Sequence, residues 1–157
     1  MIKAGIIGST GYAGGELARL LLQRDDVEII WYGSKSYIDE KYASVYPNMF
    51  QIVEDSCMDD NMKELAEKAD VIFTATPQGL CSSLIDESIL SKTKVIDLSA
   101  DFRIKDVAVY ETWYKLHHPY PSYIKAYCKS GMLSDLFLPD RLSPCKRGAH
   151  RSQYPDH

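Results

Sequence analysis

Three glycines are spaced three residues apart near the start of the chain, in the stretch IIGSTGYAGGEL (6–17). In a turn between a strand and a helix, the first such glycine permits a tight bend and the second lets backbone N–H groups approach a pyrophosphate. The third allows the helix and strand to pack closely. We predict that this glycine turn binds a dinucleotide; a glycine-rich turn that binds nothing is the alternative. Its residues are Gly8, Ser9, Thr10, Gly11, Tyr12, Ala13 and Gly14.

The residues after the second apolar run bear on which dinucleotide is bound. NAD-specific sites usually carry an acid there, which accepts a hydrogen bond from the ribose 2′-hydroxyl. Here Ser34 and Lys35 follow the run, and no acid occurs before Asp39. A hydroxyl and a lysine can bind a 2′-phosphate that a carboxylate would repel, so NADP is favoured over NAD. Lys35 could equally be a solvated loop lysine.

Two later motifs also end predicted strands, where ligands of open α/β folds bind. The first is TATPQGL (74–80), whose turn is shaped by Pro77 and Gly79; a plain strand-to-helix turn is the alternative. The second is DLSADFR (97–103), which adds Ser99 and Asp101 to the same edge. Its Arg103 is either an anion binder or the partner of a nearby acid.

These motifs require a sheet that brings the strand ends together. Short apolar runs predict buried strands over 2–8, 27–33, 70–76 and from 94 onward. Between and after them, helices are predicted over 14–24, 59–69, 78–93 and 107–115, with a loop or irregular insertion over 36–49. Strands alternating with helices predict an α/β fold with a doubly wound parallel sheet, a Rossmann-like NAD(P)-binding domain.

Composition excludes several classes of function. The net charge is −4 without a Lys/Arg-rich run, which argues against nucleic acid as a partner. No window approaches the roughly 20 apolar residues of a membrane span, and without a recognisable signal peptide the cytoplasm is the expected location. The four cysteines form no CxxC pair, so neither a disulfide framework nor a metal site is expected. They are Cys57, Cys81, Cys128 and Cys145.

Short-chain dehydrogenases also combine a glycine turn with a later pair, Tyr-x-x-x-Lys, on a helix. The only such pair here is Tyr37 with Lys41, directly after the second predicted strand, where no catalytic helix is expected. This family is therefore disfavoured.

The motifs GxTGYxGxEL, TATPQG and DLSADFR, in this order and spacing, resemble the N-terminal half of N-acetyl-γ-glutamyl-phosphate reductases. This arginine-biosynthesis family is related to aspartate-semialdehyde dehydrogenase, and the resemblance covers residues 1–116. It implies a Rossmann domain that binds NADP(H) at the glycine turn, with Ser34 and Lys35 near the adenosine 2′-phosphate. Ser99 completes the expected cofactor site together with the residues expected near the nicotinamide, which are Thr76, Pro77, Gln78 and Gly79.

In that family a cysteine thiolate attacks a small acyl-phosphate substrate and expels phosphate, and NADPH reduces the resulting thioester to the semialdehyde. The cysteine lies in the motif Asn-Pro-Gly-Cys-Tyr-Pro-Thr, and a histidine of the following domain is the acid/base. Neither the motif nor that second, catalytic domain is visible here, so no catalytic residue is assigned. We expect NADP(H) binding without turnover, and uncovered apolar surface that favours self-association. A non-catalytic dinucleotide-binding or regulatory protein is the alternative.

Residues 117–157 lack hydrophobic periodicity and are predicted to form an irregular tail outside the domain of residues 1–116. Codons for Lys129 to Asp135, read one base later, permit Asn-Pro-Gly-Cys-Tyr-Pro-Thr. The same shift over Ser143 to Arg151 permits Pro-Leu-Val-Lys-Glu-Gly-Leu-Ile-Asp, which also resembles the family. The hypothesis is that the tail is translated out of frame.

Overall fold

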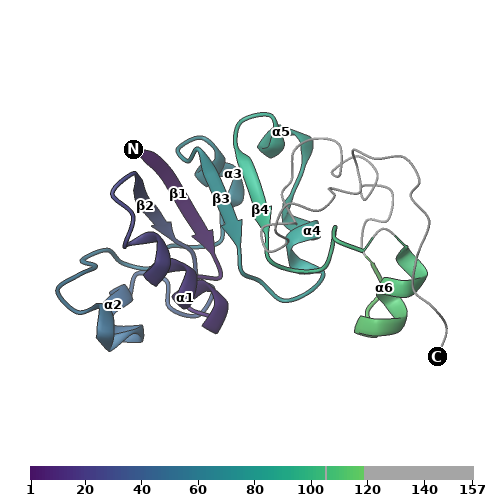
Figure 1. Ribbon diagram of the computed structural model, residues 1–157, viewed down its shortest axis with the longest axis horizontal. Helices are drawn as coiled ribbons and strands as arrows, with labels where there is room; N and C mark the ends of the chain where they lie inside the picture. Colours follow the sequence, from purple (N-terminus) through teal and green to yellow (C-terminus); the bar gives the residue numbers. More distant parts are fainter. Residues whose placement is uncertain (105, 119–157) are drawn as a thin grey trace, which may run out of the picture.

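The computed structural model describes residues 1–104 and 106–118. Its centre is a parallel sheet with the strand order β2-β1-β3-β4, which Figure 1 shows side by side. The strands are β1 (Ile2–Ile7), β2 (Val27–Tyr32), β3 (Val71–Thr74) and β4 (Lys94–Asp97). After β2 the chain crosses β1 to reach β3, so the strand order reverses direction between β1 and β3. In open α/β sheets, ligands bind outside the carboxyl ends of the strands at such a switch point.

The helices lie mostly within the predicted ranges. They are α1 (Tyr12–Leu21), α2 (Tyr42–Val45), α3 (Met62–Ala66), α4 (Leu80–Leu84), α5 (Glu87–Leu90) and α6 (Val107–Tyr114), with a 3₁₀ turn η1 (Pro47–Met49). The single helix predicted over 78–93 is wrong, because Ile85 is extended and separates α4 from α5. Asp86 then caps α5 by accepting a hydrogen bond from the Ile89 N–H at 3.0 Å.

Side chains alternate between the two faces of the sheet, as the period of a strand requires. One face carries Ala4, Ile6, Phe73 and Ile96, which pack near Leu17 and Leu21 of α1. The other carries Ile7, Trp31, Ile72 and Val95, which pack against apolar residues of α3, α4 and α5. Helices on both faces confirm the predicted doubly wound parallel sheet.

The predicted insertion at 36–49 is ordered by α2 and η1, and Tyr42 of α2 is fully buried. Its ring lies 4.4 Å from the ring of Tyr32, measured between centroids. Figure 1 shows α6 at the other end of the molecule from α2. His118, which follows α6 in the sequence, is buried, with its Nε2 atom 2.7 Å from the Asp101 carbonyl oxygen. The His118 ring is thus packed against the loop that follows β4.

The proposed frame shift concerns Lys129 to Asp135 and Ser143 to Arg151, which lie outside the described residues, as do Cys128 and Cys145. Within 1–104 and 106–118, no helix has the length and apolar character needed to cross a membrane.

Candidate functional site

The loops that follow the four strands meet at the carboxyl edge of the sheet. Ile7 of β1 pairs with Thr74 of β3, and Thr74 pairs with Asp97 of β4, so these strands end level with one another. The glycine turn follows β1, and Ser34 and Lys35 follow β2. Thr76–Gly79 follow β3 and Ser99 follows β4. The topology therefore brings every predicted cofactor residue to one edge.

The glycines of the first turn have different structural requirements. Gly8 has a φ of +76°, which disfavours other residues, and a Cβ on it would lie 2.6 Å from the Ala75 carbonyl oxygen. A Cβ on Gly14 would lie 2.2 Å from the Gly8 carbonyl oxygen. Both positions thus require glycine to form the turn. A Cβ on Gly11 would meet only the Gly8 oxygen, at an ordinary 3.5 Å, so the fold itself does not require glycine there.

Two tyrosines of the 36–49 insertion hold the carbonyl groups of the glycine turn. The Tyr42 hydroxyl donates to the Ser9 carbonyl at 3.0 Å, and the Tyr46 hydroxyl lies 2.9 Å from the Gly11 oxygen and 3.1 Å from the Thr10 oxygen. In a trans peptide bond, the carbonyl of one residue and the N–H of the next residue point in opposite directions. The N–H groups of Thr10 and Tyr12 are therefore directed away from the tyrosines, at the start of α1, where a helix leaves donors unpaired.

The tyrosines' role was missed by sequence reasoning. The tyrosine richness of the 36–49 segment was visible, but nothing in its spacing connects it to a turn more than thirty residues earlier in the chain.

Ser34 and Lys35 differ in their surroundings. Ser34 is buried, and its Oγ lies 2.9 Å from Oγ1 of Thr10, so it connects the end of β2 to the glycine turn. The side chain of Lys35 is exposed. Of the two residues expected at a 2′-phosphate, Lys35 is the one with a solvent-facing group.

A carboxyl group at this edge was also missed. Oδ1 of Asp60 is buried without a hydrogen-bond partner in the described part of the chain, 3.0 Å from where a Cβ on Gly33 would lie. Burial raises the pKa of Asp60, while the nearby Lys35 ammonium and a hydrogen bond from the Gly8 backbone N–H to this carboxyl group act in the opposite direction. Met58 pairs in parallel with Gly33, which brings Asp60 beside the end of β2 from a distant segment.

The β3–α4 turn, Thr76–Gly79, is tied to the loop after β4. The Gly79 N–H donates to Oδ1 of Asp101 at 2.8 Å, and Oε1 of Gln78 accepts from the Ala100 N–H at 2.7 Å. Pro77 is exposed, and the buried hydroxyl of Thr76 has no partner among the described residues. The turn is thus anchored on one side and leaves a polar atom unsatisfied.

Polar groups of the loop after β4 form hydrogen bonds with one another. The buried Ser99 hydroxyl donates to Oδ2 of Asp97 at 2.6 Å, so its contact with a cofactor stays a prediction. Arg103 is exposed, and its Nη2 donates to the Leu98 and Ser99 carbonyls, both at 2.9 Å. Among the described residues the guanidinium is held by backbone oxygens and forms no ion pair with a carboxylate, and anion binding stays a prediction.

We predict that Cys57 and Cys81 are unreactive in the folded chain. Both are buried, and burial raises the pKa of each thiol, so less thiolate forms at a given pH. Iodoacetamide at pH 8 should modify them at least about tenfold more slowly than in urea-unfolded chain. Peptide mass spectrometry measures the rates. Equal rates with and without urea would contradict the buried positions.

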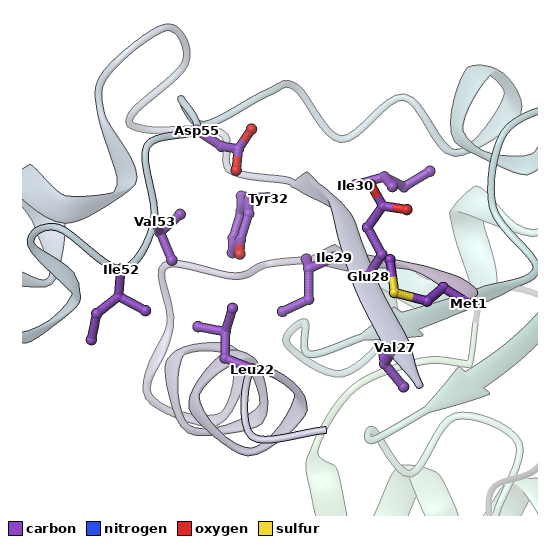
Figure 2. Close-up of a pocket in the computed structure, with 10 residues that line it drawn as sticks. All are labelled: Met1, Leu22, Val27, Glu28, Ile29, Ile30, Tyr32, Ile52, Val53 and Asp55. Atoms are coloured by element: carbon purple, nitrogen blue, oxygen red, sulfur yellow. The ribbon is translucent and has the colours of Figure 1, made fainter. Parts of the chain in front are cut away.

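A separate hollow of about 470 Å³ lies beside the edge strand β2. Figure 2 shows Ile29, Tyr32 and Val53 around it, together with Leu22 at the end of α1. None of the predicted cofactor residues lines this hollow, so it is distinct from the carboxyl-edge site.

Comparison with known proteins agrees with the motifs. Residues 3–115 match the family model described as semialdehyde dehydrogenase, NAD binding domain. The chain is 68% identical over 124 residues to the N-acetyl-gamma-glutamyl-phosphate reductase of Lachnospira eligens, and 69% identical over 125 residues to that of Lachnoclostridium phytofermentans. These matches cover 79% and 80% of this chain but 36% of each relative. The resemblance predicted from the three motifs is confirmed.

A solved structure supports the fold. The aspartate semialdehyde dehydrogenase of Candida albicans, solved with NADP, matches 68% of this chain and 32% of its own, with a TM-score of 0.53 and 18% identity. At this identity the likeness shows a shared fold alone.

Proposed function

Because the chain belongs to the semialdehyde dehydrogenase family, whose NAD-binding domain matches residues 3–115, we propose that it binds NADP(H) at the carboxyl edge of its sheet. The observation that carries this proposal is Gly11. It precedes α1 in an extended conformation that any residue can adopt, and a Cβ there would meet no close neighbour. The close approach of a pyrophosphate to the backbone explains why glycine is present.

The surroundings of the turn also suit an anion. The first turn of α1 contains no acidic residue, and the partial positive charge of a helix N-terminus favours a phosphate. We place the adenosine half beside Lys35 and the nicotinamide half beside the β3–α4 turn, where the Thr76 hydroxyl has no protein partner in the described structure. When bound, NADPH would supply a hydride. Under this proposal residues 1–116 form the cofactor domain and 117–157 the tail.

The proposal also concerns the reaction for which the longer relatives are named. Their name describes reduction of N-acetyl-gamma-glutamyl phosphate, which is an acyl phosphate. Arg103, whose guanidinium is exposed and held by carbonyls, fits an anionic substrate group. The motif Asn-Pro-Gly-Cys-Tyr-Pro-Thr does not occur in this sequence, so the chain alone should bind cofactor without turnover.

The experiment combines fluorescence titration of the full chain with NADPH and an assay of acyl-phosphate reduction. Binding without reduction supports the proposal. Reduction by the isolated chain would overturn the expected lack of turnover, and no binding of either NADPH or NADH would overturn the cofactor site. A non-catalytic or regulatory dinucleotide-binding protein would bind cofactor but have no acyl-phosphate reductase activity even when supplied with a relative's catalytic domain.

Lys35→Gln is expected to weaken NADPH binding about fivefold and to change NADH binding less than about twofold. The variant removes the exposed ammonium that we place near the 2′-phosphate, and NADH lacks that phosphate. The measurement is a fluorescence titration with both nucleotides at low ionic strength. Lys94→Gln is the matched control, because Lys94 is also exposed but begins β4 at the opposite edge. Equal loss of both nucleotides would contradict the assignment.

A further inference from the structure

A buried carboxylate connects the β3–α4 turn to α6. Asp101 is completely buried, and its Oδ1 accepts hydrogen bonds from the Gly79 N–H at 2.8 Å and from the Tyr110 hydroxyl at 2.9 Å. Its Oδ2 accepts from the Ser82 N–H at 3.2 Å. Two of these donors begin α4, and the third comes from α6.

The Asp101 carboxylate is buried, and these hydrogen-bond donors replace the water that it has lost. The position of the Gly79 N–H is therefore strongly determined by this carboxylate. Gly79 itself has a φ of +86°, which glycine adopts without strain, so the hydrogen bond to Asp101 rather than steric restriction holds its N–H in place.

The carboxylate is held in place from the sheet side as well. The Asp101 N–H donates to the Ser99 hydroxyl at 3.2 Å, and that hydroxyl donates to Asp97, which also accepts from the Thr74 hydroxyl at 2.9 Å. The hydrogen bonds thus form a continuous buried series from β3 to α6. Tyr110, at the α6 end, is fully buried.

We propose that Asp101, supported by Tyr110, is the positioning residue that sets the β3–α4 turn for the nicotinamide half of the cofactor. This inference rests on the proposed function. Asp101 itself touches no cofactor in this scheme, because its oxygens are directed at backbone N–H groups and a tyrosine hydroxyl. The turn residues Thr76–Gly79 make the contacts, and Asp101 keeps them in register with the glycine turn on the neighbouring strand.

A purely structural role of Asp101 would affect ligand binding differently from a positioning role. If Asp101 only stabilised the domain, removing one of its donors would weaken binding of every ligand at the edge of the sheet in proportion to the unfolded fraction. A positioning role predicts a selective effect, confined to ligands that carry the nicotinamide half.

The test is Tyr110→Phe in the full chain, which removes the hydroxyl but keeps the buried ring. Calorimetric titrations use NADP⁺ and 2′,5′-ADP, which has the adenosine 2′-phosphate without the nicotinamide. We expect the dissociation constant for NADP⁺ to rise about five- to tenfold and that for 2′,5′-ADP to change less than about twofold. Asp101→Asn replaces one acceptor oxygen by an NH₂ group, so the Gly79 N–H and the Ser82 N–H cannot both keep an acceptor, and the variant should show the same selective loss.

Tyr114→Phe is the matched control. Its ring lies 5.1 Å from that of Tyr110 on the same helix, but in the described structure its hydroxyl donates no hydrogen bond to the Asp101 carboxylate, so the variant should leave both constants unchanged. Parallel loss of both ligands in Tyr110→Phe, or no loss of either, would overturn the positioning role while the wild-type chain still binds. If the wild-type chain binds neither ligand, the proposed function fails, and this inference fails with it.

Discussion

Gly14→Ala is expected to destabilise the chain by about 3 kcal/mol, near the upper end of the usual penalty for overpacking. The added Cβ would lie 2.2 Å from the Gly8 carbonyl oxygen and 2.7 Å from the Ser9 Cα atom. Both are backbone atoms of a turn whose carbonyls are hydrogen-bonded to Tyr42 and Tyr46, so they cannot shift without losing those bonds. Relief would require α1 to move away from β1.

Urea unfolding followed by circular dichroism measures the loss in the free energy of unfolding. In thermal unfolding, the melting temperature of the variant should be lower by roughly 10 °C. Gly11→Ala, three residues earlier in the same turn, is the matched control and should unfold near the wild-type midpoint. A Gly14→Ala chain within about 0.5 kcal/mol of wild type would show that the helix and strand are not packed as closely as the structure has them.

The sheet could be predicted because each buried strand is a short apolar run bounded by glycine or polar residues. Val71–Thr74 is an example: helices cover both faces of the sheet at this central strand, so both of its faces are buried and the run is continuous. The glycine turn could also be predicted from the sequence, because its glycine spacing is local and its chemistry depends on backbone groups.

The residues that support the turn could not be predicted in the same way. Tyr42 and Tyr46 act through hydroxyl groups on carbonyls more than thirty positions away, and no periodicity encodes such a contact. Asp60 reaches the end of β2 because Met58 pairs with Gly33, a pairing outside the regular strands. Asp60 therefore lies beside the end of β2 although it belongs to a later segment of the chain.

The split between α4 and α5 has a local cause. The apolar residues of 78–93 have helical spacing, but the Asp86 side chain caps a new helix and Ile85 is extended and buried against the sheet. Capping by aspartate competes with helix continuation, and the burial of Ile85 decides the outcome.

Gly11→Ala is expected to weaken NADP(H) binding by tenfold or more, on the order of 1.4 kcal/mol, while leaving the fold intact. Gly11 has φ −81° and ψ 164°, and a Cβ would lie 3.5 Å from its nearest neighbour, the Gly8 oxygen. The folded chain therefore accepts alanine at this position, with a loss of a few tenths of a kcal/mol because alanine caps helices less well than glycine. A methyl group would instead occupy the space through which a pyrophosphate approaches the N–H groups of the turn.

The measurement pairs an NADPH titration with urea unfolding of the same preparation, so that stability and affinity are read separately. The two glycine variants should then give opposite patterns: Gly14→Ala lowers stability first, and Gly11→Ala lowers affinity alone. Wild-type affinity in a stable Gly11→Ala chain would mean that no phosphate approaches the backbone at Gly11. The pyrophosphate would then have to be bound elsewhere on the carboxyl edge, because the open side of the glycine turn would have no role in binding it.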